Sequence, residues 1–137
     1  MKQHTHKLFD EEISELENKI LNMGKACGLQ LSQAIKALWD RTGRIAPDVI
    51  AADEIINDFQ EKIQTMAAEV IAKRQTVAVD LRFLVSTIKI ASELERIGDY
   101  AGNIAKRSTK IKTDPDEQIV QMIIDMAEIC HSMLSDA

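Results

Sequence analysis

The stretch Ile90-Ala-Ser-Glu-Leu-Glu-Arg-Ile-Gly-Asp-Tyr-Ala-Gly-Asn-Ile-Ala-Lys-Arg107 decides the fold of this chain. Its apolar residues recur three and four positions apart, which is the spacing of an amphipathic helix. At about 100° per residue, an apolar stripe that begins at Leu81 continues without changing direction into Glu95 and Asp99. A separate polar stripe, which includes Arg96, supplies the ordinary solvent face. The two carboxylates lie off that face, so solvation is not the only explanation for them.

The composition favours an all-α protein. Of the 137 residues, 45% are hydrophobic but only 4% are aromatic, and there are five Gly and two Pro. Such a chain is typical of helices packed on aliphatic ridges, and its length fits one domain with its own core. The net charge of −5 argues against a surface for nucleic acid or anionic membranes, because both need concentrated Lys and Arg. The negative net charge does not argue against the binding of cations.

The two cysteines, Cys27 and Cys130, are too few for a disulfide framework. Both fall on apolar stripes, so we expect both to be buried thiols in a reducing compartment. No apolar run approaches the ~20 residues of a membrane span, and the polar start lacks the apolar centre of a signal peptide. These features predict a soluble, cytoplasmic protein.

Apolar periodicity predicts a first helix over about residues 7–40 and a second over about residues 47–75. Between them, Gly43 suits a left-handed backbone conformation and Pro47 suits the first turn of a helix. The first helix carries apolar residues at alternating four and three spacing, which is the seam of a helical bundle.

The third helix is predicted over about residues 77–110, with Thr76 as its N-cap. Because it is apolar on two opposite sides, we expect it to lie between neighbours. The fourth helix begins at Asp114-Pro115-Asp116-Glu117, which reads as a cap followed by proline at the first helical position. Its expected buried seam is Ile119, Ile123, Met126, Cys130 and Met133.

The fourth helix repeats part of the first at a constant offset along the chain. Ile119, Ile123, Met126, Cys130, Leu134, Ser135 and Ala137 match Leu16, Ile20, Met23, Cys27, Leu31, Ser32 and Ala34, respectively. A heptad seam does not itself require the matching Cys, Ser and Ala. We therefore interpret residues 1–112 as an antiparallel three-helix bundle repeat and residues 113–137 as the first helix of a truncated second repeat.

A polar stripe on the second helix offers possible partners for Glu95 and Asp99. It consists of Asp53, Asn57, Gln60 and Gln64. If it faces the two carboxylates, the combined oxygen ligands suit Mg²⁺, Mn²⁺, Ca²⁺ or iron. The alternative is that the stripe is an ordinary polar boundary of the helix. Glu95 and Asp99 would then be solvated or would form ion pairs with Arg96 or Arg107.

One enzymatic interpretation remains open. Glu128-Ile-Cys-His131 has the Glu-x-x-His spacing of carboxylate-bridged di-iron bundles, but such sites need a second copy and two further inward-pointing glutamates. The sequence has no phosphate-cradling glycine loop and no nucleophile elbow. The residues themselves thus leave open an iron-binding helical bundle, such as a carboxylate-bridged oxidase, and a purely structural helical interaction module.

Two segments carry a specific family resemblance. Arg74-Gln-Thr-Val-Ala-Val-Asp-Leu-Arg82 is followed by Ile88-Lys-Ile-Ala-Ser-Glu-Leu-Glu-Arg-Ile-Gly-Asp-Tyr100 and by Asn103-Ile-Ala105. With these segments the chain resembles the PhoU family of phosphate-uptake regulators. Weaker support comes from Phe9-Asp-Glu-Glu12 and Asp53-Glu-Ile-Ile-Asn57.

The resemblance implies a helical protein of two three-helix repeats, each with paired Glu/Asp-x-x-x-Asp motifs that hold metal. Glu95 and Asp99 fit one motif fully. Asp53 fits the start of the other, whose closing position holds the neutral Asn57. The implied metal is iron, zinc, manganese or magnesium. Most of the second repeat, with its own metal motifs, is absent from these 137 residues.

The resemblance also implies a function without catalysis. Members of the family are negative regulators of phosphate uptake and of phosphate-starvation signalling. They act in the cytoplasm by contact with the ATPase of the phosphate transporter and with a sensor histidine kinase, and they reach the membrane only through such partners. A homodimer of this chain would restore a six-helix arrangement.

Overall fold

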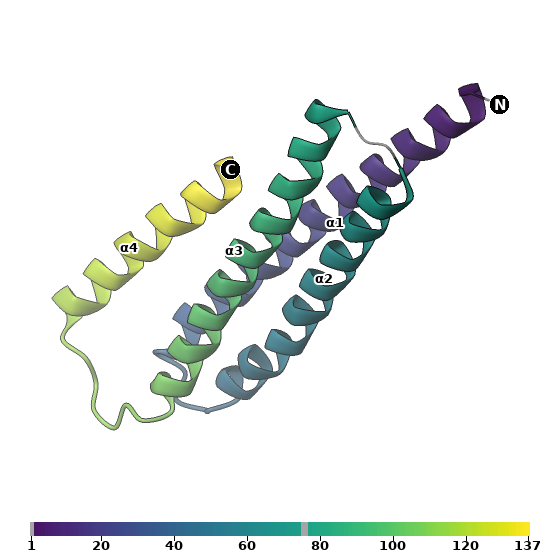
Figure 1. The fold of residues 1–137 in the computed structure, drawn as a ribbon. Coiled ribbons are helices and arrows are strands. Elements are labelled where there is room, and N and C mark those ends of the chain that lie inside the picture. Colours follow the sequence, from purple (N-terminus) through teal and green to yellow (C-terminus); the bar gives the residue numbers. More distant parts are fainter. Residues whose placement is uncertain (1, 75–76) are drawn as a thin grey trace.

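The computed structural model describes residues 2–74 and 77–137, with the side chains of the first helix described from Lys7 onward. The described residues form four helices and no strand (Figure 1). These are α1 (Lys2–Ala37), α2 (Ile45–Lys73), α3 (Ala78–Ser108) and α4 (Glu117–Asp136). The all-α prediction is confirmed. None of these helices combines the length and the apolar character that crossing a membrane would need.

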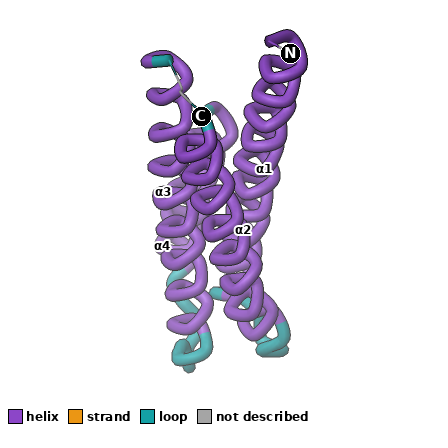
Figure 2. The backbone as a smooth tube through the Cα atoms, turned by 45° about the vertical axis from the view of Figure 1, so that its right-hand side comes forward, coloured by secondary structure: helices purple, strands orange, loops and turns teal. Residues whose placement is uncertain are grey.

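The first three helices pack against one another as an antiparallel bundle, whereas α4 lies along α1 (Figures 1 and 2). Few residues separate α1 from α2 and α2 from α3, so each helix runs back along its predecessor. The longer segment after Ser108 carries the chain to α4, whose only helical neighbour in the described residues is α1.

The main core lies between α1, α2 and α3. Its largest fully buried side chains are Leu16, Met23, Cys27, Ile56, Ile63 and Leu84. On α1 and α2 they recur four or seven positions apart, and on α3 Leu84 is followed at helical spacing by the buried Ala91 and Leu94, so each helix contributes one apolar face. The seam expected for the first helix supplies the α1 part of this core.

A second cluster of small side chains fills the end of the bundle where α1 ends and α2 begins. Its buried members are Ala34, Ala37, Ala46, Val49, Ala101 and Ala105. Because alanine adds little width to a helix, the backbones can approach closely at this end. The acidic residues of α2 and α3 lie along this closely packed region.

The turn between α1 and α2 is built around the carboxylate of Asp40. Its Oδ1 accepts hydrogen bonds from Thr42 N at 2.9 Å and Thr42 Oγ1 at 2.6 Å, and its Oδ2 accepts one from Ile45 N at 2.9 Å. The bond from Ile45, followed by that from the Thr42 hydroxyl, lowers the pKa of Asp40 to about 2. Gly43 has φ +67°, as expected, and Pro47 lies in the first turn of α2.

The start of α3 lies beside residues outside the described part of the chain, and these include Thr76, the expected N-cap. As expected, α3 lies between neighbours, since it packs against both α1 and α2. Its second apolar side is only partly covered: Leu94 and Ala101 are buried, whereas Val79 is 69% exposed and Ile90 46% exposed. The fourth helix does not cover these two residues, because it packs on α1.

The start of α4 also differs from its expectation. The N-cap is Asp116, whose Oδ1 accepts a hydrogen bond from Gln118 N at 2.8 Å, and Pro115 lies before the helix. Asp114 lies three residues before the first residue of α4, and its carboxylate forms an ion pair with Arg41 in the α1–α2 turn. This pair connects the segment before α4 to the α1–α2 turn, which lies at the same end of the bundle (Figure 1).

The predicted seam of α4 is not buried. Ile119, Met126, Cys130 and Met133 are exposed, and only Ile123 is half-buried. The matching seam of α1 is covered by two helices, α2 and α3, but α4 has only α1 beside it. One neighbour covers one side of a helix, so Cys130 is exposed where a buried thiol was expected.

Candidate functional site: an acidic face of α2 and α3

Two glycines on α3 allow polar side chains to lie close to its backbone. A Cβ atom at Gly98 would lie 3.0 Å from Gln30 Oε1 and 3.1 Å from Ile56 Cγ2. A Cβ atom at Gly102 would lie 3.9 Å from Asp53 Oδ1. The glycines therefore explain how α1 and α2 place oxygen atoms against this side of α3.

Two of these oxygens are buried without a hydrogen-bond partner in the described part of the chain: Asp53 Oδ1 and Gln30 Oε1. Gln30 is 3% exposed, and its Nε2 donates to Val49 O at 3.2 Å, one turn before Asp53 on α2. An unpartnered buried acceptor costs about 1–3 kcal/mol. A donor or a cation at this place would therefore stabilise the structure.

Glu95 and Asp99 lie on the adjoining part of α3, where Glu95 is half-buried and Asp99 exposed. Burial, and then the negative charges of Asp99 and Asp53, raise the pKa of Glu95. The influence of Asp53 supports the predicted pairing of the α2 stripe with the α3 carboxylates. Within the described residues neither Glu95 nor Asp99 forms an ion pair, and Arg96, one of the expected partners, pairs with Glu93 at 3.6 Å.

The amides of the α2 stripe also face α3. Gln64 Nε2 donates to Ser92 Oγ at 3.0 Å and Gln60 Nε2 donates to it at 3.5 Å. Asn57 is exposed, as Asp99 is. Sequence spacing thus placed Asp53, Gln60 and Gln64 toward α3, whereas Asn57 and Asp99 lie at the open edge of this face.

The donor chemistry of this face fits a hard cation. Asp53, Glu95 and Asp99 supply carboxylate oxygens, which Mg²⁺, Mn²⁺ and iron prefer, and the buried Asp53 Oδ1 has no competing donor. No group of three or more His, Cys, Asp or Glu in the described residues is already arranged around a metal position. We call Asp53, Asn57, Glu95 and Asp99 the acidic face, which is an open face and not a closed cage.

The buried thiol beside this face has a structural role. Cys27 Sγ donates to Leu94 O at 3.2 Å, and burial together with the charge of Glu95 raises its pKa to about 11. A protonated thiol is a poor metal ligand. Sequence reasoning missed Gln30, although its position three residues after Cys27 and four before Ala34 placed a polar residue on the core stripe of α1.

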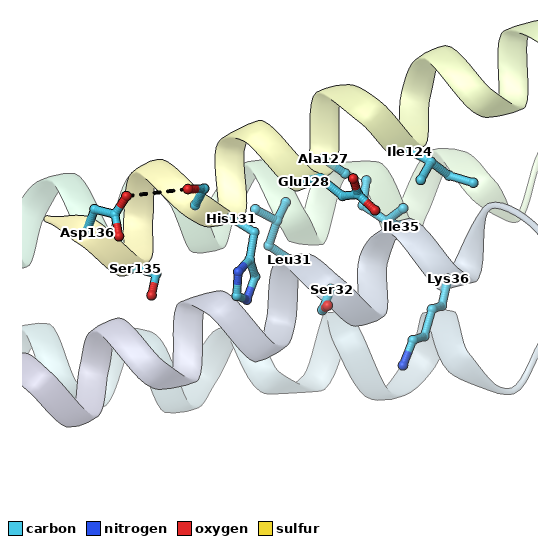
Figure 3. Close-up of a pocket in the computed structure, with 11 residues that line it drawn as sticks. Leu31, Ser32, Ile35, Lys36, Ile124, Ala127, Glu128, His131, Ser135 and Asp136 are labelled. Atoms are coloured by element: carbon cyan, nitrogen blue, oxygen red, sulfur yellow. Dashed lines mark hydrogen bonds between the residues drawn. The ribbon is translucent and has the colours of Figure 1, made fainter.

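The Glu-x-x-His pair lies elsewhere. Glu128 and His131 line an open groove of about 580 Å³ between α1 and α4, with Leu31 and Ile35 on the α1 side (Figure 3). Since α4 does not contact α3 in the described residues, this pair is separate from Glu95 and Asp99. The structure brings no second Glu-x-x-His motif to the groove, as a di-iron site would require.

Comparison with known proteins identifies the family. The sequence profile of the PhoU domain matches residues 20–108. A phosphate-specific transport system accessory protein PhoU homolog from Caulobacter vibrioides is 36% identical over 137 residues, which are 99% of this chain and 60% of the relative. Its counterpart from Clostridium acetobutylicum is 34% identical over 134 residues, covering 97% of this chain and 61% of the relative.

A solved structure shows the same fold. The crystal structure of the phosphate transport system regulatory protein PhoU from Streptococcus pneumoniae is similar with a TM-score of 0.81 and 35% sequence identity, over 93% of this chain and 60% of that one. The chain thus spans about 60% of the length of these relatives. The matched domain, the sequence identities and the shared helical arrangement show that this chain belongs to the PhoU family.

Proposed function

We propose that this chain is an accessory regulator of a phosphate transport system and that it acts by binding other proteins, without catalysis. The observation that carries the proposal is the similarity to phosphate transport accessory proteins over nearly the whole chain, at 36% identity for the Caulobacter relative. The shared fold supports it, because the bundle and the acidic face of α2 and α3 lie within the matched residues 20–108.

In this role the chain lowers phosphate uptake and phosphate-starvation signalling when phosphate is plentiful. Its partners are the ATPase of the transporter and a sensor histidine kinase, and it works in the cytoplasm, at the membrane only through these partners. The net charge of −5 supports attachment through proteins, since an acidic surface is repelled by anionic lipids.

The acidic face is proposed to hold a cation, with Asp53, Glu95 and Asp99 as charged ligands and Asn57 as a neutral one. Manganese, magnesium, iron or zinc would neutralise the repulsion that raises the pKa of Glu95. A bound cation would also satisfy the unpartnered Asp53 Oδ1. It would therefore stabilise the contact between α2 and α3.

Genetic complementation tests the regulatory role. In a bacterium depleted of its own PhoU protein, expression of this chain is expected to restore at least half of the repression of phosphate uptake in phosphate-rich medium. Glu95→Ala/Asp99→Ala should restore less than the wild type. The matched control is Glu54→Ala/Asp58→Ala, which removes an exposed acidic pair of the same spacing from α2. Stable expression of the wild-type chain with no change in uptake or in a starvation reporter would refute the proposal.

A further inference from the structure

One end of the bundle carries a group of exposed cations. It is the end at which α1 and α3 finish, and the cluster of small buried side chains described above brings these two helix ends together (Figure 1). We call the five exposed cations at these helix ends the basic strip: Lys36 on α1, Lys106 and Arg107 on α3, and Lys110 and Lys112 just after α3.

The part of the basic strip around the end of α3 is a local excess of positive charge. Between Asp99 and Asp114 the chain has no acidic residue, although its net charge is −5. Four of the five cations of the strip lie in this interval, within residues 106–112. The net charge of the whole chain therefore conceals a place to which anions are attracted.

In the described part of the chain, no member of the basic strip forms an ion pair. Lysines elsewhere do so, since Lys19, Lys62 and Lys73 each pair with an acid four residues earlier. No member of the strip has an acid at that position. The charge of the strip is thus left without a counterpart within these helices.

The helix dipole explains only part of the basic strip. Cations in the last turn of a helix are favoured by its free carbonyl groups, which accounts for Lys36, Lys106 and Arg107. This effect falls off within the last turn, whereas Lys110 and Lys112 lie beyond the end of α3. Binding of an anionic partner explains why the positive charge continues along this exposed segment.

We propose that the basic strip is a docking surface for an acidic segment of a partner protein. Complementary charges of this kind speed association and exclude partners of the wrong charge. The proposal rests on the action through other proteins proposed above. It adds the surface that is used and the charge of the partner that fits it.

The neighbouring charges favour a narrow partner over a flat one. The two helices that begin at this end carry acids in their first turns, Asp48 on α2 and Glu117 on α4. A membrane laid across the end of the bundle would bring these carboxylates close to anionic head groups, and their repulsion would oppose binding. An extended acidic chain can follow the strip and avoid them.

Fluorescence anisotropy of a labelled octaglutamate peptide tests the binding to the 137-residue chain. The wild type should bind it saturably at low ionic strength, and raising the salt from about 50 to about 500 mM should weaken binding at least tenfold. Trp39, the one tryptophan of the chain, lies just after α1 at this end, so its fluorescence should change on binding.

Two variants remove charge from the basic strip. The first replaces four cations by glutamine and should bind the peptide at least tenfold more weakly: Lys106→Gln, Arg107→Gln, Lys110→Gln and Lys112→Gln. The second, Lys110→Gln/Lys112→Gln, leaves α3 itself unchanged and should bind at least threefold more weakly.

A matched control makes the same change of charge at four exposed lysines elsewhere, and it should bind like the wild type: Lys7→Gln, Lys25→Gln, Lys73→Gln and Lys89→Gln. Circular dichroism would establish that the control and both strip variants remain folded.

The proposal is overturned if the wild type shows no saturable binding up to about 1 mM peptide at low salt, or if the strip variants bind as tightly as the control. It is overturned equally if the chain prefers poly(U) RNA, or vesicles of phosphatidylcholine and phosphatidylserine, to the peptide. A wild type that binds the peptide but does not restore repression of uptake contradicts the regulatory role alone. Restored repression without peptide binding contradicts the docking surface alone.

Discussion

Glu95 is the residue of the acidic face whose pKa is raised by its surroundings. It is half-buried, it lies one turn from Asp99 on α3, and the negative charge of Asp53 on α2 acts on it. Burial contributes most to its raised pKa, and the neighbouring carboxylates add to it. Ionised Glu95 therefore destabilises the folded state, and the stability of the protein should depend on pH through this residue.

A raised pKa means that the folded state binds the proton more tightly than the unfolded state. The stabilisation from the protonated group is fully present below the ordinary pKa of 4.5 and is lost as pH rises through the raised value. Glu95→Gln removes the ionised form. Without added metal it should raise the melting temperature by about 2–4 °C at pH 7 and by much less at pH 4.

The control for this prediction is Glu61→Gln on α2, an exposed carboxylate whose loss should change the melting temperature little at either pH. Thermal melts by circular dichroism at the two pH values provide the measurement. A lower melting temperature for Glu95→Gln at pH 7 would contradict the assignment of Glu95 as a destabilising charge.

At the scale of the helices, the contact of α3 with α1 and α2 depends on a missing side chain at Gly98. An added Cβ would lie 3.0 Å from Gln30 Oε1 and 3.1 Å from Ile56 Cγ2, and Ile56 is itself buried. Overpacking of this kind costs about 1–3 kcal/mol, which exceeds the gain of about 1 kcal/mol in helix propensity. Gly98→Ala should therefore lower the free energy of unfolding by about 1 kcal/mol.

Gly24 in the middle of α1 provides the opposite case, since a Cβ there would meet nothing within 4 Å. Gly24→Ala should raise the free energy of unfolding by about 0.5–1 kcal/mol through helix propensity alone. Urea denaturation of both variants compares them. Equal effects of the two substitutions would show that α3 is not closely packed at Gly98.

The helices themselves were predictable because each carries a continuous apolar stripe at helical spacing. The expected ranges for α2 and α3 agree with the structure to within two residues. The expected range for α1 begins five residues too late and ends three residues too late, because Asp40 belongs to the turn. The cap of α4 was misplaced because each of two aspartates, Asp114 and Asp116, is followed by a residue that suits the first helical position. The structure places the cap at Asp116, whose Oδ1 accepts the hydrogen bond from Gln118 N.

For the candidate site, spacing along single helices identified Asp53, Glu95 and Asp99, since the acids interrupt or border apolar stripes. It could not show that Asn57 is exposed or that Gln30 reaches the same region from α1. Both facts depend on how three helices are rotated about their axes. That rotation is set by packing, including the close approach at Gly98.

At the scale of the whole molecule, α1, α2 and α3 share a core and α4 is attached on one side. The burial of Cys130 was predicted wrongly because its match in α1, Cys27, lies between two partner helices. An internal repeat predicts which side of a helix is apolar but not whether a neighbour is present to cover it. The division at residue 112 into a complete repeat and the start of a second one stays a prediction.

The acidic face joins α2 and α3 within the family-matched part of the molecule, so its ability to hold a cation is the central claim of this account. Titration of Mn²⁺ into the metal-free protein, followed by electron paramagnetic resonance of the unbound ion, tests it most directly. An open face with few charged ligands should bind with a dissociation constant on the order of 10⁻⁴ M. Glu54→Ala/Asp58→Ala should bind like the wild type, and Glu95→Ala/Asp99→Ala at least tenfold more weakly. Equal binding by the Glu95→Ala/Asp99→Ala protein and the wild type would contradict the claim.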